Sequence, residues 1–191
     1  MIDRTWYDRY LARYRQSLFE TDVFDACCQF RDFAVRIQES GAKLIFAGNG
    51  ASAAIASHVS VDFTKQAGVT AINFNEPDLI TCLSNDYGYE NWIAEAIKLY
   101  ATPQDAVVLI SSSGRSDNMV AAAKYVRQRG LPLITFTGFA ADNPLRSLGE
   151  VNFWLDSRSY NVVECTHMIW ITMVIDMVIG RAEYSVTSSS E

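Results

Sequence analysis

The sequence has few of the residues that carry metal sites and disulfides. Its 191 residues include four cysteines and two histidines. Cys27 and Cys28 are adjacent, and neither they nor Cys82 and Cys165 have the paired spacing of a zinc site. Adjacent cysteines are poor disulfide partners because the bond needs a specific separation and angle. We therefore expect reduced, mostly buried thiols in a cytoplasmic protein.

Positive charge and long apolar runs are also scarce. Lys and Arg number 16 against 22 Asp and Glu, which gives a formal net charge of −6. This balance disfavours direct nucleic-acid binding, which needs a basic surface. No uncharged apolar run approaches the ~20 residues of a membrane span. The closest run, Met168 to Ile179, is interrupted by Asp176, and the N-terminus has no signal-peptide pattern. We expect no membrane partner.

The remaining composition is that of a globular chain, with 49% apolar and 20% charged residues. The length fits a single domain over residues 1–191. Residues 1–40 look helical, because aromatic and apolar residues such as Trp6, Tyr10 and Tyr14 recur at four-residue spacing. We expect an N-terminal helical hairpin there, buried by another subunit, and a flexible Ser-rich tail over residues 185–191.

From residue 43 onward, short apolar runs alternate with helical patterns. The runs are rich in Val, Ile and Phe, as fully buried parallel strands should be. The expected strands are Lys43–Ala47, Thr70–Phe74, Ala106–Ile110, Pro132–Thr137 and Val151–Leu155. The expected helices are Ala51–Gln66, Asn91–Tyr100, Asn118–Arg129 and Asn161–Ile179. This alternation predicts an α/β fold with a mostly parallel sheet between layers of helices.

Two strand-to-helix turns have the composition of an anion site. The first is Gly48-Asn-Gly-Ala-Ser-Ala, and the second is Ser111-Ser-Ser-Gly-Arg-Ser-Asp-Asn. Helix N-termini favour anions through unpaired N–H groups and the helix dipole. The four hydroxyls of the second turn exceed what a helix cap needs. Because ligands of such sheets bind beyond the carboxyl ends of the strands, the turns predict a site for a phosphorylated small molecule.

The first turn is less specific than the second. Gly-Asn-Gly is common at tight turns that bind nothing, since both residue types tolerate positive φ. The turn lacks the third glycine of a dinucleotide fingerprint, and no Gly-Lys-Ser/Thr of a P-loop follows. We therefore expect no nucleotide cofactor. In the second turn, Arg115 could add positive charge or remain solvated.

Three motifs taken in order resemble the sugar isomerase (SIS) domain. They are Gly48-Asn-Gly-Ala-Ser, Asn85-Asp-Tyr-Gly and Ser111-Ser-Ser-Gly-Arg-Ser. The resemblance is closest to the phosphoheptose isomerase subgroup and covers essentially the whole chain. It implies a five-stranded parallel sheet flanked by helices, and a homotetramer with sites between subunits.

The resemblance also implies a set of ligand-binding residues. Ser52, Ser111, Ser113 and Ser116 would hold the sugar phosphate, with Ser112 at a Ser/Thr position of the same turn. Asn49 and Asp86 would contact sugar hydroxyls, and Gly50 belongs to the same binding set.

The positions for catalysis depart from the family pattern. The family's His-x-x-x-Glu pair is His58 and Asp62 here, on one face of a helix. Its C-terminal Gln-Glu-x-His, followed five residues later by a second His, aligns with Glu164, His167 and Thr172. That second His is the family's general acid and a metal ligand. A threonine hydroxyl does not titrate near neutral pH, so Thr172 leaves the acid unassigned.

The reaction that the resemblance implies converts sedoheptulose 7-phosphate to a heptose 7-phosphate. Such an aldose–ketose isomerisation needs a base near two adjacent carbons, and an acid or metal at the carbonyl oxygen. The catalytic candidates are Asp62 as base, His167 as acid and Glu164. Alternatively, His58, Asp62 and Glu164 form a three-ligand site for one divalent metal such as zinc.

These residues also admit other interpretations. A lone histidine on an apolar helix, as His167 is, is often a core residue. The loss of the second histidine at Thr172 favours a function of another class. In that alternative the chain is a non-catalytic SIS protein that binds a sugar phosphate or a protein partner such as a replication initiator.

Overall fold

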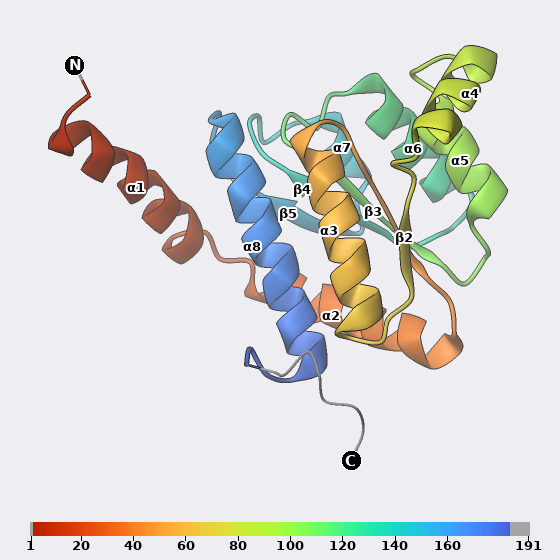
Figure 1. Ribbon diagram of the computed structural model, residues 1–191, viewed down its shortest axis with the longest axis horizontal. Coiled ribbons are helices and arrows are strands. Elements are labelled where there is room, and N and C mark those ends of the chain that lie inside the picture. The colour runs from red at the N-terminus through yellow and green to blue at the C-terminus, as the bar shows by residue number, and fades with distance from the viewer. Residues whose placement is uncertain (1, 184–191) are drawn as a thin grey trace.

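The computed structural model describes residues 2–183, and the predicted tail at 185–191 lies outside the described residues. Five parallel strands form one sheet in the order β2-β1-β3-β4-β5 (Figure 1). The strands are β1 (Leu44–Gly48), β2 (Ala71–Asn73), β3 (Ala106–Ser111), β4 (Leu133–Thr137) and β5 (Val151–Trp154). The predicted α/β fold with a five-stranded parallel sheet is confirmed.

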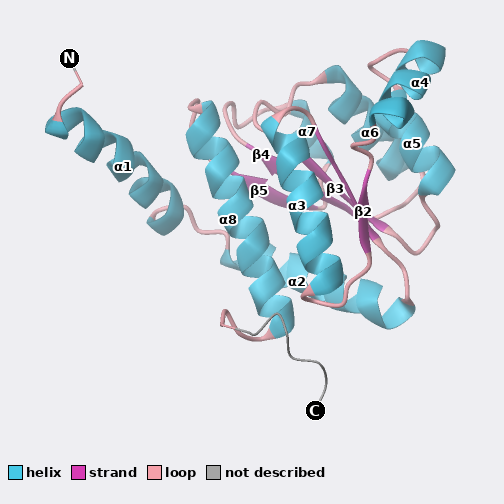
Figure 2. Ribbon diagram, viewed as in Figure 1, coloured by secondary structure: helices cyan, strands magenta, loops and turns pink. Residues whose placement is uncertain are grey.

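Helices cover both faces of this sheet (Figure 2). They are α1 (Arg4–Phe19), α2 (Phe24–Ser40), α3 (Ala51–Lys65), α4 (Pro77–Tyr87), α5 (Trp92–Tyr100), α6 (Asp117–Gln128), α7 (Pro144–Leu148) and α8 (Tyr160–Ile179). Successive side chains of a strand face opposite sides. In β1, Leu44 and Phe46 pack with α2, α3 and α8, whereas Ile45 and Ala47 pack with α5 and α6. Both faces of the strand are therefore buried.

Two helices were not predicted from the sequence. Both α4 and α7 begin with a proline at the first helical position, Pro77 and Pro144. Each buries a single residue, Leu83 in α4 and Leu145 in α7. Helix α7 has only five residues, too few to show the 3.6-residue apolar period that marks the longer helices.

The two N-terminal helices form where the sequence predicts them, but they diverge. Helix α2 buries Cys27, Phe30 and Ile37 against the sheet. Helix α1 projects away from the body of the molecule and contacts it along α8 (Figure 1). Its residues Trp6 and Tyr7 are exposed over nearly half of their surface. Helix α1 therefore presents an apolar surface that this chain leaves uncovered.

Helix α8 contains the apolar run from Met168 to Ile179 and extends it to 20 residues, which include the charged Glu164 and Asp176. It is the one helix within residues 2–183 that is long and apolar enough, by length and composition, to cross a membrane. Its side chains Val163, Ile171 and Val174 are fully buried, and the helix packs against α2, α3 and β4. A core position of this kind accounts for an apolar composition on most sides of a helix.

The sheet order brings the two predicted turns together. Strands β1 and β3 are neighbours, and Gly48 at the end of β1 pairs with Ile110 near the end of β3. The turns that follow them therefore leave the same edge of the sheet side by side. At the opposite edge, Lys43 and Asp105 form an ion pair of 2.6 Å at the starts of the same two strands.

Candidate functional site

A small pocket lies where the two turns meet the start of α8. Its volume is about 120 Å³. It is lined by Asn49, Ser52, Ser111, Ser112, Ser113, Ser116, Tyr160 and Glu164. Six of these are predicted binding residues from the two turns. The other two predicted binding residues, Gly50 and Asp86, are not among the lining residues. Asp86 lies in the last turn of α4, where Asn85 Nδ2 donates to its Oδ1 at 3.0 Å.

The first turn needs its glycines to bring α3 close to β1. A Cβ at Gly48 would lie 2.6 Å from the backbone carbonyl carbon of Ser52, so a larger residue would push the helix away. Gly50 has a φ of +56° and precedes the first residue of α3. The positive φ favours glycine there. The turn thus delivers Ser52, which is buried, to the floor of the pocket.

The second turn is shaped by its own hydroxyls. Ser111 Oγ accepts a hydrogen bond from the Gly114 N–H at 3.2 Å, and Ser113 Oγ accepts one from the Arg115 N–H at 3.2 Å. Within the described part of the chain, no side chain caps the first turn of α3 or of α6. Ser52 in the first turn of α3 and Ser116 immediately before α6 line the pocket, so the N-termini of both helices lie beside it, an arrangement that attracts an anion.

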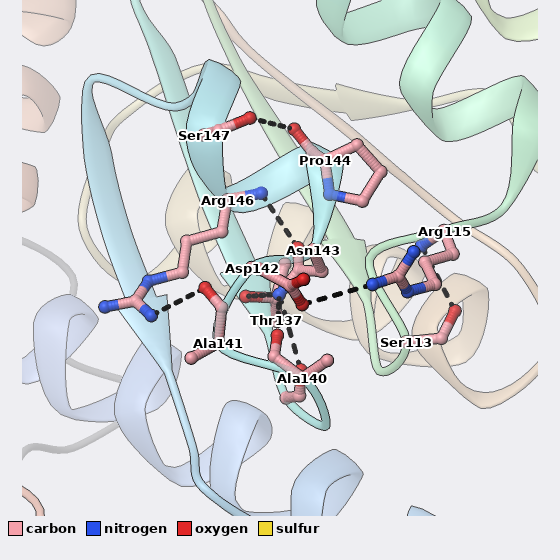
Figure 3. Close-up of polar contacts among 11 residues, drawn as sticks. Ser113, Arg115, Thr137, Ala140, Ala141, Asp142, Asn143, Pro144, Arg146 and Ser147 are labelled. Carbon is pink, nitrogen blue, oxygen red and sulfur yellow. Dashed lines mark hydrogen bonds and ion pairs between the residues drawn. The ribbon is translucent and has the colours of Figure 1, made fainter.

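The loop between β4 and α7 supports the second turn from behind (Figure 3). Asn143 is fully buried, and its Nδ2 donates to Ala140 O at 2.9 Å. Its Oδ1 accepts from the Arg146 N–H at 2.9 Å, and it occupies the space that a side chain at Gly114 would need. The Leu145 N–H donates to Gly114 O at 3.1 Å. The loop between β4 and α7 thus holds the second turn in position.

Arg115 belongs to this support. Its guanidinium forms an ion pair with Asp142 at 3.2 Å, on the exposed side of the turn (Figure 3). It is not among the side chains that line the pocket. Positive charge in the pocket therefore comes from the helix N-termini.

Two side chains of α8 complete the pocket, four residues apart on one helical face. Ser112 Oγ contacts Glu164 Oε1 at 3.5 Å, so a carboxylate stands beside the serine hydroxyls. Tyr160 was not predicted, although its spacing from Glu164 is readable in the sequence. Its ring meets that of Phe139 edge-on at 4.8 Å. Phe139 itself has a φ of 57°, an uncommon conformation for a residue other than glycine.

His58 and Asp62 form a pair outside this pocket. The distance from His58 Nε2 to Asp62 Oδ2 is 3.1 Å, on one face of α3 as the spacing indicates. The His58 side chain is 57% exposed. A histidine beside a carboxylate can hold and transfer a proton, and this one is accessible from outside the chain.

His167 lies in the core and is not among the residues that line the pocket. It is fully buried, between the rings of Phe136 and Trp170. Its Nε2 lies 3.0 Å from Thr137 O, a carbonyl that can only accept, so the proton is on Nε2. Burial lowers the pKa of His167 to about 4, against the smaller opposing effect of the bond to Thr137. A neutral, buried imidazole is poorly suited to the predicted role of acid.

The predicted three-ligand metal site does not assemble within one chain. Among residues 2–183, no three His, Cys, Asp or Glu side chains form a cluster that could hold a metal ion. His58 and Asp62 lie together, but Glu164 lines the serine pocket. Catalytic zinc sites use three protein ligands, so the donors that one chain supplies do not fit such a site.

Thr172 is engaged by its own helix. Its hydroxyl donates to Met168 O and to Ile169 O, both at 3.0 Å. Such bonds to the preceding turn are the usual way for a helical threonine to satisfy its hydroxyl. The Thr172 hydroxyl is thus bonded within α8.

Comparison with known proteins agrees with the three motifs. A family model described as SIS domain matches residues 7–138, more than half of the chain. Phosphoheptose isomerase from Mycobacterium tuberculosis is 30% identical over 163 residues, which cover 82% of this chain and 82% of that protein. A probable phosphoheptose isomerase from Thermoplasma acidophilum is 32% identical over 146 residues, covering 73% and 79% of the two chains.

The fold agrees as well. The structure of a phosphoheptose isomerase from Francisella tularensis superposes with a TM-score of 0.86 at 21% identity, covering 95% of this chain and all of that one. At this identity the likeness concerns the fold alone. Taken with the two sequence relatives and the family match, it shows that the chain belongs to the SIS domain family, in its phosphoheptose isomerase-like subgroup.

Proposed function

We propose that this protein is an aldose–ketose isomerase that acts on a phosphorylated sugar. The observation that carries the proposal is the convergence of five serine hydroxyls and the Glu164 carboxylate in one pocket. Hydroxyls at two helix N-termini suit a phosphate, and the carboxylate suits proton transfer at carbon. The relatives that bear the name phosphoheptose isomerase support sedoheptulose 7-phosphate as the substrate.

The ligand orientation follows from the charges of the pocket. A phosphate binds at the serine turn, where four serine side chains line the pocket. The Glu164 carboxylate repels a second anion, so the carbon skeleton of the sugar lies toward Glu164. Tyr160, on the same side, provides an aromatic wall for that skeleton.

In the proposed reaction, Glu164 replaces the expected base Asp62, which does not line the pocket, and removes the proton from the carbon next to the carbonyl. The carbonyl oxygen gains a proton, which gives an enediol. Glu164 then returns its proton to the former carbonyl carbon, and the hydroxyl on the carbon that was first deprotonated loses its proton and becomes the new carbonyl. The product is an isomer of the substrate, and the carboxylate is regenerated.

A second group must supply the proton to the carbonyl oxygen. We assign this role to His58 in place of His167. Histidine changes its protonation near neutral pH, and Asp62 holds the His58 ring in place at 3.1 Å. Since this pair lies outside the pocket of its own chain, it would enter the site of a neighbouring subunit. That arrangement accords with the homotetramer that we expect from the sequence.

The test compares two isosteric variants with the wild-type protein. Purified protein, with and without added zinc, is incubated with sedoheptulose 7-phosphate, and the products are separated. Glu164→Gln should abolish conversion while inorganic phosphate still binds in calorimetry. Asp62→Asn should lower kcat less, because it only releases the His58 ring. A wild-type protein that binds phosphate but leaves the sugar unchanged would overturn the proposed reaction.

The alternative of a non-catalytic binding protein retains one supporting observation. Thr172 is bonded within its own helix and His167 is buried, so neither family position offers an acid. In that case the protein binds sedoheptulose 7-phosphate without converting it, and Glu164→Gln tightens binding by removing a negative charge beside the phosphate.

A further inference from the structure

The two turns are joined to each other by a pair of side-chain amides. Asn49 follows β1, and Asn118 lies in the first turn of α6. The Nδ2 of Asn49 donates to the Oδ1 of Asn118 at 2.9 Å, and the Nδ2 of Asn118 donates to the Oδ1 of Asn49 at 3.0 Å. Asn118 is only 2% exposed, so the bonds are largely shielded from water. This reciprocal pair fixes the relative position of the turns.

A third residue reaches the same amide from another part of the chain. Tyr89, in the connection between α4 and α5, donates its hydroxyl to the Oδ1 of Asn49 at 3.2 Å. The Tyr89 ring lies against Trp92 with 6.4 Å between centroids. Neither Tyr89 nor Asn118 is among the side chains that line the pocket, whereas Asn49 is.

The hydrogen-bonding capacity of an amide then determines what Asn49 offers a ligand. An amide oxygen accepts two hydrogen bonds, and an amide nitrogen donates two. The oxygen of Asn49 has both of its bonds filled, by Asn118 and Tyr89. Its nitrogen uses one hydrogen toward Asn118, so one N–H remains. Asn49 can therefore donate to a ligand but has no acceptor left for a sugar hydroxyl.

We infer that Asn118 and Tyr89 are positioning residues that fix the Asn49 amide as a hydrogen-bond donor to an oxygen of the ligand. The inference rests on the proposed function, because the oxygen is that of a phosphate or of the developing enediol. A donor that is held in place before the reaction stabilises such an oxygen without reorganising. Asn49 thus meets the ligand as a donor, so a sugar hydroxyl of the kind that the resemblance implies could only accept from it.

The first experiment measures hydrogen exchange at the Asn49 side-chain amide in the protein without ligand. Nuclear magnetic resonance of the Asn49 side-chain NH₂ should show one hydrogen that exchanges slowly, because Asn118 holds it, and one that exchanges faster. Asn118→Leu should abolish the difference. Equal exchange of both hydrogens in the wild-type protein would overturn the inference, whether or not the protein is an isomerase.

The second experiment is a double-mutant cycle through Asn49. Asn49→Ala should weaken inorganic phosphate binding, or lower kcat with sedoheptulose 7-phosphate, by about 10- to 100-fold, as expected for one hydrogen bond to a charged oxygen. An effect on phosphate binding assigns the donor to the phosphate, and an effect on kcat alone assigns it to the enediol.

In the same cycle, Tyr89→Phe should cost about 5-fold and Asn118→Leu about 10-fold, as for neutral hydrogen bonds. Neither change should have any effect in the Asn49→Ala background, since both act through Asn49. Equal losses in the two backgrounds would overturn the inference. If the sugar is not converted, the cycle can still be measured through phosphate affinity. Failure to convert the sugar would count against the proposed isomerase reaction but not against the positioning of Asn49.

Discussion

Gly114 shows how one missing side chain determines the shape of the second turn. Its φ is +62°, which disfavours any residue with a Cβ. The space where a Cβ would lie is also filled by Asn143, a buried residue with four hydrogen-bond partners of its own. Gly130 has a similar φ of +69°, but nothing lies within 4 Å of its Cβ position. A side chain at Gly130 would therefore cause backbone strain alone, whereas one at Gly114 would cause backbone strain and steric overlap.

Exchange of these glycines for alanine should therefore have different effects. Gly130→Ala should cost about 1–2 kcal/mol of stability, from the positive φ alone, and leave phosphate affinity unchanged. Gly114→Ala has the same strain and also displaces Asn143, so phosphate affinity should fall at least about tenfold. Thermal unfolding and phosphate calorimetry of both variants measure this, and equal phosphate affinities in the two variants would contradict it.

His167 gives a second prediction at this scale, on the dependence of stability on pH. Its pKa is about 4 in the folded protein, against an ordinary value of 6.5. Between these values the unfolded chain binds more protons, so stability rises with pH and is fully present above about 6.5. The contribution lost on acidification is on the order of 3 kcal/mol.

The measurement is urea unfolding at several pH values between 4 and 7. His167→Gln, which can still donate to Thr137 O, should flatten the slope in this range. His58→Gln is the matched control, because that side chain is largely exposed. A slope that persists in His167→Gln would assign the pH dependence to other groups.

At the scale of elements, the two ends of strands β1 and β3 have different roles. The turns after β1 and β3 form the pocket, while Asp105 joins the starts of the same strands. Asp105 accepts bonds from Lys43 Nζ at 2.6 Å and from the Lys43 N–H at 2.9 Å. Burial acts to raise the pKa of Asp105, but these bonds and those from Thr102 outweigh it and lower the pKa. The pair stabilises the strands without touching the pocket.

Asp105→Asn should therefore lower stability without altering ligand binding. Removal of one partner from a buried ion pair costs about 3–5 kcal/mol, because the other charge stays behind. Lys43 is partly exposed, so we expect the lower end of that range. Phosphate affinity of the folded protein should be unchanged, and a parallel loss of affinity would show that the edges are coupled.

At the scale of the whole molecule, apolar side chains remain exposed on two neighbouring surfaces. Helix α1 exposes Trp6 and Leu11, and α8 exposes Ile169 and Met173. Grouped apolar surface of this kind commonly marks contacts with other protein chains. Contact with further copies of this chain would cover these side chains and bring the exposed His58 next to another subunit.

This surface makes assembly a measurable prediction. Leu11→Glu together with Ile169→Glu should reduce the proposed homotetramer to smaller species in size-exclusion chromatography with light scattering, since burial of a charge in an apolar contact is costly. Leu99→Glu, an exposed leucine on α5 in the opposite layer, is the control and should leave the mass unchanged. Activity should fall with the tetramer, and full activity in a monomer would contradict a shared site.

The sequence alone determined the parts of this protein that depend on short-range pattern. The five strands and the longer helices form within a few residues of the predicted bounds, because burial on both faces and helical spacing leave a local record. The serines of the second turn were identifiable for the same reason, since they lie between Ala106–Ile110 and a helical run. Their hydroxyls line one pocket, as the motif indicated.

Tertiary structure decided which distant side chains share a site. The pairing of β1 with β3 brings Asn49 to Asn118, and the packing of α8 on the sheet places Glu164 and Tyr160 in the pocket. The same packing buries His167 and separates Glu164 from the pair on α3. No local spacing records these relations, because they depend on the strand order and on which helix face meets the sheet. The composition of the site therefore depends on the fold, whereas its serine turn can be identified from the local sequence.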